Sequence, residues 1–187
     1  MLTVPSAVIC VTHGISIGLA IDIACCADIR ICARDTKFSV KEVDIGMAAD
    51  IGTLSRLPKI VGSTSWVKDV CLSGRYFTAA EALAVGFVSQ VQESKAAALD
   101  AAAKLAALIA SKSPIAVQGT KEILNHARDH TVEDSTFMDP FGSTALTNVV
   151  IGLRYTGVWN AAALQSADFT TALLSGIQKT KPTFAKL

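Results

Sequence analysis

The stretch HGISIGLAIDIACCADIRICARDTKFSVKEVDIGMAADIGTLSRLPKIVG, residues 13–62, decides the fold. It joins short apolar runs through glycine turns, and residues 41–50 hold three carboxylates among apolar neighbours. These acids are Glu42, Asp44 and Asp50, and Lys41 is the one opposite charge within that segment. Burial raises the pKa of a carboxyl group because the charged form loses hydration. We therefore expect the segment to be partly buried and suited to proton transfer near neutral pH.

Hydrophobic patterning predicts an α/β first half and a nearly all-helical chain from residue 95 onward. The expected strands cover residues 7–11, 28–33, 38–40 and 87–91. The expected helices cover residues 18–26, 51–57, 62–73, 78–86, 95–111 and 166–176, with others starting at Pro114 and after Thr131. Pro58 should end the helix over 51–57, because proline disrupts a helix interior. Thr78 and Glu81 fit a capping box at a helix start.

Composition narrows the classes of function. The 187 residues carry a formal net charge of +1 and 6% aromatic residues, which gives no basis for a nucleic-acid-binding surface. Mean hydropathy is +0.44, so we expect either a large core or apolar faces covered by other subunits. No apolar run reaches the length of about 18 residues typical of a membrane span. The five cysteines form no C-x-x-C pair, which predicts buried thiols in a reducing compartment rather than disulfides.

The strongest candidate site combines Asp22 with Glu42 and Asp50. Asp22 lies in the expected helix 18–26, and the other two acids lie in the turn-rich segment that follows the strand at 38–40. Two carboxylates on opposite sides of a substrate can take a proton from one carbon and return one to another, and a third can help to hold a proton. Helix capping or simple surface exposure explains the same acids equally well, with Asp50 as the N-cap of the following helix. For Asp44, capping or an ion pair with Lys41 or Arg56 is the simpler interpretation.

The glycine turn HGISIGLA, residues 13–20, is a second candidate feature. A glycine turn that leads into a helix exposes backbone N–H groups, which can stabilise an oxyanion. The same turn can equally serve only to join a strand to a helix.

Residues 13–62 resemble the core of the crotonase (enoyl-CoA hydratase/isomerase) superfamily, and within it they resemble the Δ3,5-Δ2,4-dienoyl-CoA isomerases. Asp22 in the glycine-led helix, KEVD at 41–44 and AADIGTLSRLP at 48–58 carry the resemblance, which continues through SKSPIAVQGTK at 111–121. It implies a crotonase-like α/β core built as a ββα spiral, covering residues 1–112 and incomplete at the N-terminus. Residues 113–187 would form a C-terminal helical region for oligomerisation, followed by the tail.

The resemblance also implies residue roles. Glu42 and Asp50 would be the proton-transferring pair, Asp22 would assist beside them, and the backbone N–H of Leu19 would supply half of an oxyanion hole. The implied reaction converts a 3,5-dienoyl-CoA into a 2,4-dienoyl-CoA during fatty-acid β-oxidation. No metal or redox cofactor is implied, because CoA is part of the substrate. A homo-oligomer, trimer or hexamer, is the implied assembly.

Two departures from the family pattern keep other functions open. Members usually carry three glycines where this chain has Gly18-Leu19-Ala20, and the chain begins where a member is already well under way. A weakly active or non-catalytic subunit is therefore one alternative, and an enoyl-CoA hydratase is another.

Two smaller motifs bear on location and metal binding. Ala185-Lys186-Leu187 resembles a peroxisomal address read by an import receptor, with mitochondrion or cytosol as the alternatives. His126 and His130 are spaced one helical turn apart but lack a third ligand, so a solvated helix end is the simpler interpretation.

Overall fold

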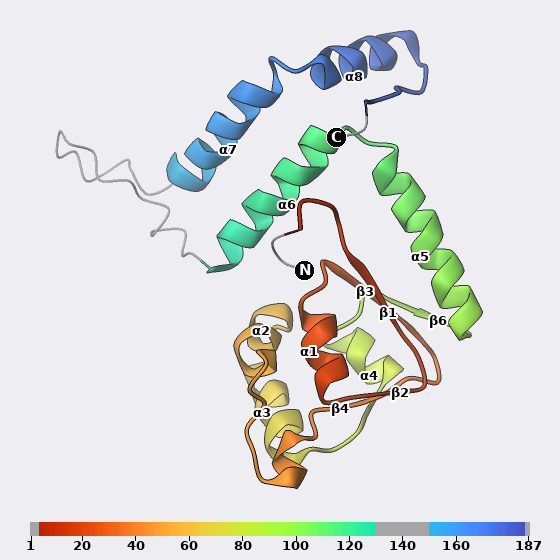
Figure 1. The fold of residues 1–187 in the computed structure, drawn as a ribbon, viewed down its shortest axis with the longest axis vertical. Coiled ribbons are helices and arrows are strands. Elements are labelled where there is room, and N and C mark those ends of the chain that lie inside the picture. Colours follow the sequence, from red (N-terminus) through yellow and green to blue (C-terminus); the bar gives the residue numbers. More distant parts are fainter. Residues whose placement is uncertain (1–3, 130–149, 186–187) are drawn as a thin grey trace, which may run out of the picture. The chain divides into compact units, whose positions relative to one another are not determined.

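The computed structural model describes residues 4–129 and 150–185, in two compact units. Within that part of the chain, unit 1 contains residues 4 and 8–106, and unit 2 contains residues 5–7, 107–129 and 150–185. The division falls inside the long helix α5 (Lys95–Ala110), which Figure 1 shows in green. The expected functional boundary at residue 112 stays a prediction.

Unit 1 is built from short strands and helices in alternation. Its strands are β1 (Ile9–Thr12), β2 (Ile15–Ile17), β3 (Ile29–Ala33), β4 (Lys37–Ser39), β5 (Phe77–Thr78) and β6 (Gln90–Gln92). Its helices are α1 (Leu19–Cys25), the 3-10 helix η1 (Glu42–Ile45), α2 (Thr53–Ile60), α3 (Thr64–Ser73), α4 (Ala79–Ala84) and most of α5. Figure 1 shows α1 beside α2, and α1 carries two of the candidate site residues, Leu19 and Asp22.

The strands form two small sheets, and the first four strands alternate between them. One sheet has the order β1-β3-β6 and is parallel throughout. The other has the order β2-β4-β5, with β2 parallel and β5 antiparallel to β4. Gly14, between β1 and β2, has φ +59, and its carbonyl accepts the Lys37 backbone N–H at 2.7 Å. A helix follows each of the two strand pairs, which gives the ββα repeat.

An aromatic cluster lies at the centre of unit 1. The ring of Phe38 stacks on Phe77 at 5.2 Å between centroids and meets Phe87 edge-on at 5.5 Å. Trp66 meets Phe77 edge-on at 5.0 Å. All three phenylalanines are fully buried, so β4, β5 and the chain leading into β6 are joined by one apolar core.

The strands predicted at 7–11, 28–33 and 38–40 are confirmed, within two residues at each end, as β1, β3 and β4, whereas the one predicted at 87–91 begins three residues later, as β6. The strands β2 and β5 were not predicted. They have three and two residues, too few for an alternating pattern to be visible in the sequence.

The helix predicted over residues 51–57 was wrong at both ends. The structure places it at Thr53–Ile60, with Pro58 inside its last turn. Because Pro58 has no N–H, only the carbonyl of Leu54, four residues earlier, loses its helical hydrogen bond. Leu54 is exposed, so water can donate to this carbonyl instead. The proline is therefore tolerated near the helix end.

The capping box at the start of α4 is half confirmed. Thr78 Oγ1 accepts the backbone N–H of Glu81 at 3.2 Å, as predicted. The Glu81 carboxylate does not return to Thr78; it accepts from Trp66 Nε1 at 2.8 Å and from Arg75 Nη2 at 2.6 Å. It therefore holds α4 to α3 and to the loop between them.

Unit 2 contains α6 (Pro114–Asp129), α7 (Val150–Ala163) and α8 (Ala167–Gln178). Ser113 Oγ donates to Asp168 Oδ2 at 2.6 Å, which links the start of α6 to the start of α8. The helix predicted after Thr131 begins outside the described residues. His130, Lys186 and Leu187 also lie outside them. Within residues 4–129 and 150–185, no helix combines the length and hydropathy needed to cross a membrane.

Candidate functional site

Asp22 is buried on the inner side of α1 and bound to the start of α2. It is 2% exposed. Thr53, the first residue of α2, donates its backbone N–H and its Oγ–H to Asp22 Oδ1, each at 2.7 Å. The N-cap residue Gly52 has no side chain to accept these donors, so Asp22 supplies the cap of α2 from a neighbouring helix.

Glu42 begins η1 and reaches the start of α1. A Cβ on Gly18 would lie 3.1 Å from Glu42 Oε1, so the carboxylate rests against the backbone there. Gly18 is the N-cap of α1, with φ 54 and ψ −120, a conformation that essentially only glycine adopts without strain. Glu42 Oε2 is buried and has no hydrogen-bond partner among the described residues. An unpaired buried acceptor of this kind is rare and is suited to receive a proton or a donor from a ligand.

The two carboxylates meet one helix from two directions. Gly18, against which Glu42 lies, is four residues from Asp22, which corresponds to about 6 Å along a helix axis. The Glu42 carboxylate thus lies at the start of α1, and the Asp22 carboxylate projects from the buried side of its first turn.

Asp50 lies in the loop that leads into α2, and its side chain is exposed. The alternative that it caps this helix is wrong, because the helix begins at Thr53 after Gly52, and Asp22 accepts the Thr53 donors. Asp50 precedes by three residues Thr53, whose donors bind Asp22. The joint action of Asp22, Glu42 and Asp50 stays a prediction.

The expected burial of the acidic segment was also wrong. Among residues 41–50 only Ala49 is buried, while Val43, Ile45 and Met47 are exposed, Ile45 at 76%. The turn of η1 directs Val43 and Ile45 outward, and the Glu42 carboxylate is directed inward. The apolar residues next to each acid in the sequence therefore did not predict whether that acid is buried in the fold.

Asp44 makes the ion pair that its position suggested. Lys41 Nζ lies 2.7 Å from Asp44 Oδ2. A Cβ on Gly74 would lie 2.8 Å from Asp44 Oδ1, so η1 packs against the C-cap residue of α3. These contacts fix the short helix that carries Glu42.

Leu19 is the first residue of α1, and its side chain is 53% exposed. Its backbone N–H belongs to the first turn, where no intrahelical acceptor is available. The preceding Gly18 N–H is already used by the carbonyl of Ser39 at 3.0 Å. The oxyanion role of Leu19 stays a prediction.

A model of the family described as "Enoyl-CoA hydratase/isomerase" matches residues 1–139. The chain belongs to this family. The α/β crotonase-like fold expected from the sequence is therefore confirmed. A crystal structure of a putative enoyl-CoA hydratase/isomerase from Mycobacterium abscessus superposes with a TM-score of 0.84 at 24% identity, over 100% of this chain and 64% of that one.

The curated relatives that the chain matches include dienoyl-CoA isomerases. It is 43% identical over 186 residues to the mitochondrial Delta(3,5)-Delta(2,4)-dienoyl-CoA isomerase of Mus musculus, covering 98% of this chain and 52% of that protein. It is 39% identical over 180 residues to the peroxisomal enzyme of that name from Arabidopsis thaliana, covering 96% and 58%. The chain thus spans about half the length of these curated relatives.

Sequence reasoning missed Thr53 and the contact at Gly18 in this crotonase-like chain. A threonine at the start of a predicted helix is a weak signal, because it is a common capping residue. Its two hydrogen bonds to Asp22 join residues far apart in the sequence, so no local pattern reveals them. The left-handed φ of Gly18 was signalled only by the presence of glycine before a helix.

The cysteines of this family member agree with the expectation of free thiols. Cys25, Cys32 and Cys71 are buried, and Cys10 and Cys26 are half-buried. Burial raises the pKa of the Cys25 thiol to about 12 and that of Cys32 to about 11. These thiols are neutral at physiological pH and serve as packing groups.

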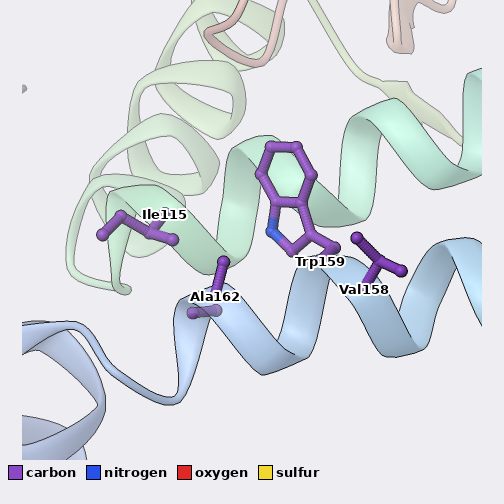
Figure 2. A pocket seen from close by; sticks show the side chains of 5 residues that line it. Ile115, Val158, Trp159 and Ala162 are labelled. Atoms are coloured by element: carbon purple, nitrogen blue, oxygen red, sulfur yellow. The ribbon is translucent and has the colours of Figure 1, made fainter.

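A separate pocket of about 340 Å³ lies in unit 2, between α6 and α7. Figure 2 shows the ring of Trp159 crossing from α7 toward α6. The lining residues are Ile115, Val158, Trp159, Ala162 and Ala163, and none of the predicted site residues is among them. The ring lies directly on Gly119, where a Cβ would be 1.9 Å from Trp159 Nε1. Trp159 is thus a packing anchor between two helices.

Proposed function

We propose that this chain carries the acid–base half of a Δ3,5-Δ2,4-dienoyl-CoA isomerase site, which moves double bonds along a CoA-bound acyl chain. The observation that carries the proposal is the buried Glu42 Oε2 beside Gly18, which has no hydrogen-bond partner in the described part of the chain, with Asp22 buried on the helix that Gly18 caps. The similarity to dienoyl-CoA isomerases supports it. Because the chain spans about half the length of those relatives, its own activity is part of the proposal.

The reaction needs two proton transfers and no redox partner. One carboxylate of the Glu42–Asp50 pair removes a proton from C2, between the thioester and the first double bond. The electron pair left behind spreads along the acyl chain to the thioester oxygen. The other member, as a carboxylic acid, adds a proton at C6, and the double bonds come to lie at positions 2 and 4. The proton count of the substrate is unchanged.

Two other groups would assist this transfer. Asp22 would lie beside the pair and help to hold a proton through the electrostatic coupling of neighbouring carboxylates. The Leu19 N–H would stabilise the negative thioester oxygen, an interaction for which one donor contributes about 3 kcal/mol in well-studied enzymes. No metal or redox group enters the proposed scheme.

The test is turnover of a synthetic 3,5-dienoyl-CoA by the purified chain, followed by the ultraviolet absorbance of the conjugated product. Glu42→Gln should lower kcat by a factor of about 10² to 10⁴, the usual contribution of a positioned acid–base group. Glu93→Gln is the matched control, because Glu93 pairs with Arg34 at an exposed site. Equal rates for the two variants would contradict the proposal.

An enoyl-CoA hydratase is the alternative within the same family. It predicts addition of water to a 2-enoyl-CoA, detected as a 3-hydroxyacyl-CoA by mass spectrometry. Water addition without any dienoyl isomerisation would replace the isomerase proposal with this one.

A second candidate function is a non-catalytic or weakly active subunit. A run of exposed apolar side chains on β2 and α1 favours it, namely Ile15, Ile17, Leu19 and Ile23. A non-catalytic subunit predicts no turnover by the purified chain, a weakly active one predicts a rate far below that of a full-length isomerase, and both predict co-purification with such an isomerase. Turnover without a partner at the rate of a full-length isomerase would exclude both.

We also propose a homo-oligomer, trimer or hexamer, assembled through unit 2. On α8 the side chains of Phe169, Leu173 and Ile177 are spaced four residues apart, share one face of the helix and are exposed. Sedimentation velocity of wild type and Leu173→Glu is the test. A wild-type monomer would contradict the proposal.

The proposed location is the peroxisome, through the terminal Ala185-Lys186-Leu187 and its import receptor. A plant relative is named as peroxisomal and a mouse relative as mitochondrial, so the address must be tested in this chain. A fluorescent protein ending in residues 176–187 should enter peroxisomes, and the same fusion without the last three residues should not.

A further inference from the structure

The bond between Thr53 and Asp22 has a property that capping alone does not require. Both donors of Thr53, the backbone N–H and the hydroxyl, bind one oxygen, Oδ1, at 2.7 Å. No described residue donates a hydrogen bond to Oδ2. The two oxygens of a chemically symmetric carboxylate therefore have different surroundings.

This asymmetry matters because the last torsion of an aspartate is soft. Rotation about χ2 has a broad, roughly two-fold profile, so an unrestrained carboxylate presents either oxygen. Two donors from one residue that converge on one atom remove that freedom. Both partners are buried, Thr53 at 1% and Asp22 at 2% exposed, so water does not compete for the donors.

We infer that Thr53 is a positioning residue for acid–base chemistry: its hydroxyl holds Oδ1 of Asp22 and leaves Oδ2 as the oxygen that assists the proton-transferring pair, Glu42 and Asp50. The inference rests on the proposed function, because it gives Asp22 a part in proton transfer. Thr53 itself touches no reacting atom and acts through Asp22.

The variant Thr53→Val tests this directly, because it replaces the hydroxyl with a methyl group and keeps the backbone N–H. One of the two bonds to Oδ1 is lost, and the carboxylate is free to turn. Thr53→Ser restores a hydroxyl at the same place. We expect kcat to fall at least about tenfold in Thr53→Val with KM nearly unchanged, because misplaced reacting groups lose rate without losing substrate affinity. In Thr53→Ser, kcat should remain within about twofold of wild type.

A matched control separates positioning from stability. Thr36 is also 1% exposed in unit 1, and its Oγ1 donates to the carbonyl of Ala33 at 2.6 Å, away from the acids. Thr36→Val loses a buried hydroxyl of the same kind. It should lower the melting temperature and leave kcat unchanged. If Thr53→Val does not fold, Thr53→Ala takes its place, since alanine is well accepted at a helix start.

A double-mutant cycle shows whether Thr53 acts through Asp22. In an Asp22→Asn background the carboxylate that assists the pair is lost, so adding Thr53→Val should change kcat no further. A full additional tenfold loss in that background would overturn the inference, because independent effects multiply.

A readout that needs no turnover is the ¹³C signal of the Asp22 carboxyl in protein labelled at aspartate, identified by its disappearance in Asp22→Asn. It should move in Thr53→Val, return in Thr53→Ser and stay in place in Thr36→Val.

If wild type turns over dienoyl-CoA and Thr53→Val is equally fast, the inference fails and the proposed function stands. If wild type does not turn over, the proposed function fails, and the carboxyl signal decides whether Thr53 positions Asp22. An unmoved signal in Thr53→Val overturns the inference in either case.

Discussion

Glu42 lies against Gly18, so closely that a Cβ on Gly18 would be 3.1 Å from Glu42 Oε1. Glycine is required at position 18 for two reasons. Its φ of 54 and ψ of −120 disfavour any side chain, and the absence of a Cβ leaves room for the carboxylate. The start of α1 and the placement of Glu42 are thus set by one residue without a side chain.

Gly18→Ala should therefore be destabilising. Backbone strain at such a position costs about 1–3 kcal/mol, and the displaced carboxylate adds to it. Urea unfolding measures the loss. Gly62→Ala is the matched control, because a Cβ on Gly62 would meet no atom within 4 Å and its φ is not left-handed. Equal unfolding free energies for the two variants would contradict this account.

Asp22→Ala should destabilise unit 1 more than a surface aspartate does. It leaves the Thr53 N–H and hydroxyl buried without an acceptor, which costs about 1–3 kcal/mol for each unsatisfied group. Asp22→Asn keeps an acceptor oxygen and should lose less. Asp44→Ala is the comparison, because its exposed pair with Lys41 contributes at most about 1 kcal/mol. Chemical denaturation that ranks Asp44→Ala as the most damaging of the three would refute the capping role.

The pH dependence of stability should contain a contribution from Glu81. The hydrogen bond from the Arg75 guanidinium holds the pKa of Glu81 below its ordinary value of 4.5. A carboxyl group whose pKa is lowered by folding adds stability above the unfolded pKa and loses it as the pH falls through the folded pKa. Because both side chains are about one-third exposed, the effect should stay below about 1 kcal/mol.

Glu81→Gln tests this contribution. Between pH 7 and pH 3 the unfolding free energy of the variant should fall less steeply than that of wild type. Parallel curves would show that the pair with Arg75 does not act on stability through this titration.

Sequence patterns predicted the framework of unit 1 because apolar runs and turns are local. They located β1, β3, β4 and β6, and they identified the family through the acids at 22, 42 and 50. They did not predict the capping of α2 by Asp22, the contact of Glu42 with Gly18, or the outward direction of Ile45. Each of these depends on where a second segment lies in space, and a periodicity within one segment carries no such information.

Thiol reactivity should follow burial. Burial raises the pKa of Cys25 to about 12, so at pH 8 almost none of that thiol is the reactive thiolate. Cys26 is its neighbour in sequence but is half-buried rather than buried. Iodoacetamide at pH 8 should label Cys26 well before Cys25, as mapped by peptide mass spectrometry. After unfolding in urea both should react at similar rates. Equal labelling of the two in the native protein would show that Cys25 is not enclosed.

Gly119→Ala should disturb the packing of α6 against α7. A Cβ at this position would lie 1.9 Å from Trp159 Nε1, and the indole ring cannot yield without leaving the helix surface. We expect a red-shifted tryptophan fluorescence and a loss of about 1–3 kcal/mol in the free energy of unfolding, the usual cost of overpacking.

Gly157→Ala on α7 is the control, because a Cβ there meets no atom within 4 Å. It should be neutral or stabilising, since alanine favours a helix over glycine by about 1 kcal/mol. Adding Trp159→Leu to Gly119→Ala should restore part of the loss, because the smaller side chain makes room for the new methyl group. If the double variant is no more stable than Gly119→Ala alone, the ring is not the group that excludes a side chain at position 119.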